Sequence, residues 1–188
     1  MKEDFLKNVI AKELQKVGQE NAVYMFISKD ENYHLVNTLI LQHLVKKLTG
    51  ICVTMKSGYL NIVQNLRKLN IDVNERLLFV DAVTSKKRKE FSKHKNLILT
   101  GSSKSLTDLS IIISEMINTD KFDFLFFDSL EGLLKFNEQE LSEKFMHFII
   151  NKMRGFNLEG IIISLSIDKD SEKLISTLAP LCDKVIRI

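Results

Sequence analysis

The residues with the clearest potential for chemistry are Asp128 and Ser129, which follow the apolar run Phe124–Phe127. An aspartate that ends a buried strand can hold Mg²⁺ in proteins that transfer phosphoryl groups. The same pair also suits a purely structural role, because Asp and Ser are preferred where a helix or turn begins. The pattern alone leaves both interpretations open.

A polar residue ends or directly follows six of the strands that the sequence predicts, including the strand before Ser129. These polar residues are Ser28, Thr54, Asp81, Thr100, Asp128 and Ser164. In an open parallel sheet, ligands bind beyond the carboxyl ends of the strands. These residues therefore predict either a polar cleft along one edge of the sheet or a set of turn and helix-capping residues.

A phosphate site needs a glycine-rich loop, whose backbone N–H groups wrap the phosphates, followed by Lys and Ser or Thr. The sequence contains no G-x-x-x-x-G-K-[ST]. After the strand 23–27 it reads SKDENY (28–33), where Asp30 and Glu31 would repel a triphosphate. We expect Asn32 or Asp30 to cap the helix that follows, with the acids at its positive end.

No cofactor is therefore expected. ATP with Mg²⁺ remains as an alternative, in which Lys29 supplies charge, Thr38 a hydroxyl and Asp128 the magnesium acid, with Ser129 beside it as a further binding residue. The four histidines show no ligand spacing, so no metal site is predicted.

One basic run, Lys86-Lys87-Arg88-Lys89, stands out from the mixed charges of the chain. It could contact a nucleic-acid backbone or an acidic partner. A solvated surface loop is the favoured interpretation, and aromatic residues for base stacking are nearly absent from the stretch. Nucleic acid is thus an unlikely partner.

Short apolar runs alternate with helical patterns along the chain. The predicted strands are 23–27, 51–53, 77–80, 96–99, 124–127, 160–163 and 184–188. This alternation predicts an α/β fold with a mainly parallel central sheet and helices on both faces. We expect a single RecA-like domain over 1–188, with an N-terminal helix in 1–18, roughly Lys2 to Val17, and a core over 23–188.

The totals of the 188-residue chain exclude several classes of protein. Net charge is only +3, the two cysteines show no metal spacing, and no apolar run approaches the length of a membrane span. The first residues mix acids and bases in a helical pattern, unlike a signal peptide. We therefore expect a cytoplasmic protein without membrane contact.

Several segments, in order, resemble the RecA/KaiC-like ATPase superfamily, and most closely an archaeal KaiC-like branch whose members often lack a phosphate loop. They are SKDENYHLVNTLILQHL, GICVTMKSGYLNIVQNLRKLNID, LLFVDAVTS, SSKSLTDLSIIISEMI and FLFFDSLEGLLKFNEQELSEKFMHFIINKMRGFNLEGIIISL. The resemblance covers nearly the whole chain from about Val23, and its specificity lies in the order and spacing of these segments.

This resemblance implies a RecA-like core in which active members use a Glu just after the second strand as general base. The corresponding stretch here, Val53–Ser57, contains no acid. With the phosphate loop missing as well, the resemblance implies a non-catalytic pseudo-ATPase that acts as a regulatory or protein-interaction module. Its partner would be a copy of itself or an active paralogue.

Overall fold

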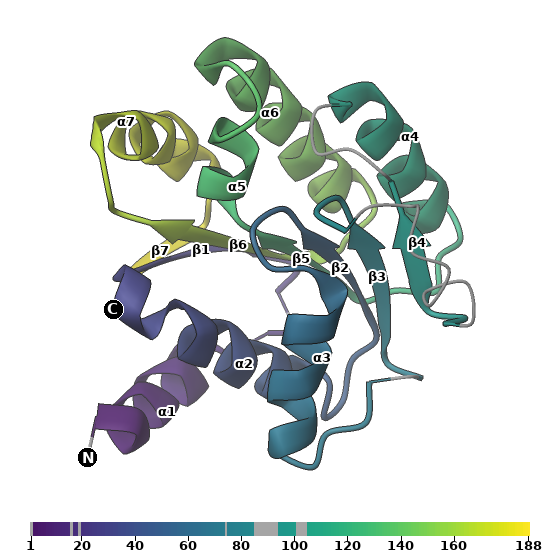
Figure 1. Ribbon diagram of the computed structural model, residues 1–188, viewed down its shortest axis with the longest axis vertical. Coiled ribbons are helices and arrows are strands. Elements are labelled where there is room, and N and C mark those ends of the chain that lie inside the picture. The colour runs from purple at the N-terminus through teal and green to yellow at the C-terminus, as the bar shows by residue number, and fades with distance from the viewer. Residues whose placement is uncertain (1, 16, 19, 74, 85–93, 101–104) are drawn as a thin grey trace.

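Seven strands form one sheet in the computed structural model, which describes residues 2–15, 17–18, 20–73, 75–84, 94–100 and 105–188. The strand order is β4-β3-β2-β5-β6-β1-β7, and every paired strand runs parallel to its neighbour. Helices α1, α2 and α3 cover one face of the sheet, and α4 to α7 cover the other (Figure 1). The α/β fold expected from the alternating pattern is confirmed.

Each predicted strand is present. The bounds are β1 Val23–Ser28, β2 Gly50–Thr54, β3 Leu77–Asp81, β4 Leu97–Leu99, β5 Phe124–Asp128, β6 Glu159–Leu165 and β7 Lys184–Arg187. Four strands extend by one residue to include the polar side chain at their carboxyl end. Strand β4 begins one residue later than expected, at Leu97, although the Asn96 carbonyl still accepts from Phe79 N–H at 2.8 Å.

Helices connect most of the strands, as the alternating pattern predicts. Their bounds are α1 Lys2–Glu13, α2 Tyr33–Leu44, α3 Tyr59–Lys68, α4 Leu106–Ile117, α5 Leu130–Leu134, α6 Gln139–Gly155 and α7 Lys169–Leu178. Helix α1 is shorter than the 2–17 expected. Irregular turns follow it, and the left-handed Gly18 (φ 84°) redirects the chain.

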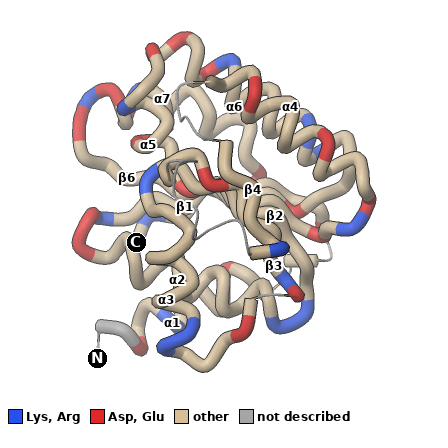
Figure 2. The backbone as a smooth tube through the Cα atoms, turned by 45° about the vertical axis from the view of Figure 1, so that its right-hand side comes forward, with Lys and Arg blue, Asp and Glu red and all other residues tan. Residues whose placement is uncertain are grey.

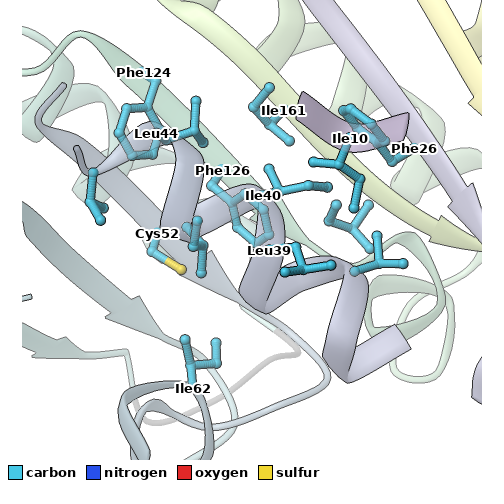
Figure 3. Packing of buried hydrophobic residues seen from close by; sticks show 14 of the residues in the cluster. Ile10, Phe26, Leu39, Ile40, Leu44, Cys52, Ile62, Phe124, Phe126 and Ile161 are labelled. Carbon is cyan, nitrogen blue, oxygen red and sulfur yellow. The ribbon is translucent and has the colours of Figure 1, made fainter. Parts of the chain in front are cut away.

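The two faces of the sheet bury separate apolar clusters because successive strand residues point to opposite sides. In β5, Phe124 and Phe126 pack toward α1–α3, whereas Leu125 and Phe127 pack toward α4–α7. Figure 3 shows the first cluster, with Phe124 near Leu44 and Phe126 near Ile40, both of α2. Burial on both faces explains why the strands appear in the sequence as continuous apolar runs.

Acidic and basic residues of the described chain are interspersed along the outer helices and loops (Figure 2). None of the helices among the described residues is long and apolar enough to cross a membrane.

Candidate functional site

The polar strand ends meet at the carboxyl edge of the sheet. The register aligns Asp81 of β3 with Thr54 of β2, and Thr54 with Asp128 of β5. All three side chains have zero exposed surface. A row of buried polar groups therefore crosses the middle of the sheet, as the strand-end pattern predicts.

Asp128 is closed off by the first turn of α2. The Tyr33 hydroxyl donates a hydrogen bond to Asp128 Oδ1. The Asn37 amide donates to the same oxygen at 2.9 Å. Tyr33 and Asn37 are four residues apart, which places both on one face of the helix. Asp128 Oδ2 is buried and has no hydrogen-bond partner among the described residues.

Burial raises the pKa of Asp128 to about 7, because the charged form loses its hydration. The hydrogen bonds from Tyr33 and Asn37 and the charge of Lys56 oppose this rise, and the charge of Glu131 adds to it. Burial and the Asp128 carboxylate likewise raise the pKa of Tyr33 well above its ordinary value. Tyr33 is thus a neutral donor at any physiological pH.

The turn that joins β1 to α2 packs against Lys56. Its Nζ lies 4.4 Å from the centroid of the Tyr33 ring and 2.7 Å from Asp30 Oδ1. Residues Asp30–Asn32 form one turn of 3₁₀ helix, and neither Asp30 nor Asn32 caps α2 through its side chain. The capping expectation is wrong for this turn: Asp30 pairs with Lys56 instead.

The residues proposed for a nucleotide make different local contacts in the structure. Lys29 is exposed before the 3₁₀ turn, and the Thr38 hydroxyl donates to the His34 carbonyl at 2.6 Å within α2. Ser129 accepts from the Gly132 N–H at 3.4 Å and so caps α5. The contacts of Asp128 come from Tyr33 and Asn37, which sequence reasoning did not single out. Their spacing of four on the helix after β1 was the available signal.

Other strand-end residues serve turns and caps. Asp81 accepts from the backbone N–H groups of Tyr59, Val83 and Thr84 at 2.8 to 2.9 Å. It thereby fixes the start of α3 and the turn after β3. Away from the strand ends, Ser105 caps α4 by accepting from Asp108 N–H at 3.3 Å. The hydroxyls of Ser28 and Thr54, in contrast, are buried and unpartnered among the described residues.

Glu131, in the first turn of α5, is a further acid at this edge, and the sequence patterns did not single it out. Its Oε1 accepts from the Ser164 hydroxyl at 2.6 Å and from Leu165 N–H at 2.7 Å. Burial raises its pKa despite these hydrogen bonds. Glu131 therefore ties α5 to the end of β6.

A cavity of about 450 Å³ opens beside Glu131, between the loop after β2, helix α5 and the start of α7. Met55 and Leu134 contribute to its walls. The cavity is lined by residues of α5 and α7, which cover the α4–α7 side of the sheet, whereas Tyr33 belongs to α2 and to the apolar cluster on the α1–α3 side. Lys56 borders both regions.

Two expectations concern residues beyond this edge. The basic run Lys86-Lys87-Arg88-Lys89 lies outside the described residues. Within the described ranges, no group of three His, Cys, Asp or Glu side chains is arranged to hold a metal ion.

The chain belongs to the family of unknown function DUF7504, whose model matches residues 49–188. No curated protein matches the sequence. Among solved structures, the chain is similar to a KaiC-like protein from the hyperthermophilic archaeon Pyrococcus horikoshii OT3. The TM-score is 0.63 at 12% identity, over 89% of this chain and 71% of the other. The fold is therefore RecA-like.

Proposed function

We propose that this DUF7504 chain is a non-catalytic RecA/KaiC-like pseudo-ATPase that acts as a regulatory or protein-interaction module. The observation that carries the proposal is the closed environment of Asp128. Its Oδ1 is occupied by Tyr33 and Asn37, and the side chain has no exposed surface.

The described side chains do not fit a magnesium ion. Mg²⁺ requires near-octahedral oxygen ligands and keeps several of its waters. Asp128 is the acid at the appropriate strand end, yet Tyr33, one of the largest fully buried side chains, lies directly against its carboxylate. A hydrated ion would have to displace the Tyr33 ring and the start of α2.

The joint 28–33 does not fit a triphosphate either. Phosphate loops expose backbone N–H groups through glycines, which allow close approach of the anion. Here Asp30 carries negative charge and already pairs with Lys56. The Thr38 hydroxyl, which would be needed for a metal, is committed to the His34 carbonyl.

A chain of this fold without a nucleotide site would act through its surface. Part of that role follows from the family resemblance, because RecA-like domains bind nucleotide between subunits and an inactive subunit can complete the site of its neighbour. We therefore propose self-association or pairing with an active KaiC-like paralogue as the mode of action.

Size-exclusion chromatography with light scattering tests this proposal. The chain is run alone and mixed with a KaiC-like ATPase from the same organism, in each case with and without Mg-ATP. The expected result is a defined oligomer or a stoichiometric complex. A chain that stays monomeric at all concentrations and joins no complex would overturn the protein-interaction role.

The alternative nucleotide role has its own test in thermal unfolding. Under the proposal, Mg-ATP leaves the unfolding midpoint of the wild type unchanged. If Mg-ATP raises the midpoint by several degrees and Asp128→Ala abolishes that rise, the chain binds nucleotide through Asp128 and is not a pseudo-ATPase.

A further inference from the structure

Three exposed apolar side chains border the cavity beside α5. Val83 is 43% exposed, Phe136 38% and Ile167 54%. They come from separate segments, after β3, α5 and β6 respectively. Exposed apolar groups that gather around a concave surface mark sites where another molecule binds.

Two walls of the cavity, α5 and the loop after β2, are held together by close contacts. A Cβ atom on Gly132 would lie 2.4 Å from the Met55 carbonyl oxygen and 2.8 Å from the Lys56 backbone nitrogen. Helix α5 therefore packs its backbone directly on the loop after β2, and Glu131 anchors the same helix to β6. Because both walls are fixed, a ligand would meet a pre-formed surface and lose less free energy to ordering.

The cavity is lined by residues of both charges. They are the acids Asp168, Asp170 and Glu131 and the bases Lys56 and Lys135. Lys56 is ion-paired with Asp30, and the Lys135 Nζ lies 5.4 Å from the centroid of the Phe136 ring. The α7 side of the rim therefore presents exposed acids, Asp168 and Asp170, to an incoming partner.

Asp168 is held in place by its structural role. It accepts from Ser171 N–H at 2.8 Å as the N-cap of α7. Hydrogen bonds from the Ser171 backbone and side chain lower the pKa of Asp168, so its carboxylate stays ionised at neutral pH. The positive end of the α7 dipole offsets part of this charge. Asp170 is the second residue of α7 and is exposed.

We infer that this cavity docks a segment of a partner protein that presents a bulky apolar side chain next to a lysine or arginine. The apolar side chain packs against Met55, Leu134 and Phe136, and its basic neighbour faces the acids of the α7 side. The inference rests on the proposed function in one respect, namely that the partner is a protein.

The test is a titration with short capped peptides, followed by NMR of the methyl groups of the full chain in the absence of nucleotide. The probe has a central phenylalanine flanked by two lysines in a Gly/Ser background. Matched peptides replace the phenylalanine with alanine, or both lysines with glutamates. We expect the probe to shift the methyl signals of Met55, Val83, Leu134 and Ile167, and the matched peptides to bind at least several-fold more weakly.

Two surface variants locate the binding. Ile167→Asp should abolish the shifts, whereas Ile111→Asp, which changes an equally exposed apolar residue on α4, should leave them intact. Asp170→Lys should weaken binding of the probe by about 2–5-fold, which corresponds to the free energy of an exposed ion pair. The same variant should bind the glutamate peptide more tightly than the wild type does.

Several results would overturn the inference. The first is the absence of methyl shifts at millimolar concentrations of the probe peptide. The second is that the alanine or the glutamate peptide binds as tightly as the probe. The third is that Ile167→Asp and Ile111→Asp reduce the methyl shifts equally. The proposed function is tested independently of the peptides. It is wrong if Mg-ATP binds at Asp128, whether or not the peptides bind. If the peptides fail while Mg-ATP does not bind, the partner docks elsewhere on the molecule.

Discussion

At the scale of single residues, the central feature is the hydrogen bond that the Tyr33 hydroxyl donates to the Asp128 carboxylate. Tyr33 and Asp128 are 95 positions apart in the chain and both are buried. In a low-dielectric site an ionised carboxylate needs hydrogen-bond donors, and here Tyr33 and Asn37 supply them. The residues that would otherwise mark a catalytic acid thus form a structural contact between α2 and β5.

Tyr33→Phe tests this contact. At pH 8 the variant removes a donor from a buried, ionised carboxylate, so the free energy of unfolding should fall by about 1.5–3 kcal/mol. Tyr24→Phe is the matched control, because Tyr24 is also a buried tyrosine but lies on β1 away from Asp128, and it should cost less than about 1 kcal/mol. Equal losses in urea denaturation would contradict the role assigned to the Tyr33 hydroxyl.

The raised pKa of Asp128 predicts a pH dependence of stability. Its ordinary value is 3.8, and burial raises it to about 7 in the folded protein. Between these values the folded state holds a proton that the unfolded state releases, so this group lowers stability as pH rises from about 4 to about 7.

Asp128→Asn removes that titration. The variant should gain stability relative to the wild type as pH rises across this window, by up to about 4 kcal/mol at pH 8. Contributions of Glu131 and other groups are common to both proteins and largely cancel in the difference. Urea denaturation at several pH values measures it. A difference that does not change with pH would mean that Asp128 titrates normally.

At the scale of elements, α5 is positioned by close backbone contact. Gly132→Ala would force its Cβ into the Met55 carbonyl, 2.4 Å away, and backbone cannot move aside as a flexible side chain can. We expect a loss of more than about 2 kcal/mol in unfolding free energy.

Gly155→Ala is the matched change, because a Cβ at that helical position meets nothing within 4 Å. It should be neutral or stabilise α6 by about 0.5–1 kcal/mol. If thermal and urea unfolding show the same effect for both alanine variants, α5 does not rest on the loop after β2 as described.

The elements also show how far sequence reasoning reaches. Buried strands such as Phe124–Asp128 are recognisable because burial on both faces demands continuous apolar residues. The turn 28–33 is less recognisable, because its contacts include Lys56, which is distant in sequence and pairs with Asp30. For the same reason the partners of Asp128 could be found only after α2 was placed over the carboxyl edge of the sheet.

At the scale of the whole molecule, the RecA-like fold keeps its sheet and its polar edge, while the two sides of that edge differ. The α1–α3 side seals Asp128 under Tyr33. The α4–α7 side opens into the cavity ringed by Val83, Phe136 and Ile167. Under the proposed function, the sealed side takes the place of a nucleotide site and the open side offers a surface for a protein partner.

The most direct test of this view is isothermal titration calorimetry of the purified chain with ATP and ADP in the presence of Mg²⁺. If Asp128 is closed by Tyr33 and Asn37, no binding heat should appear up to about 1 mM nucleotide. Saturable binding with a micromolar Kd would contradict the pseudo-ATPase proposal. It would mean that the turn 28–33 opens to hold phosphate.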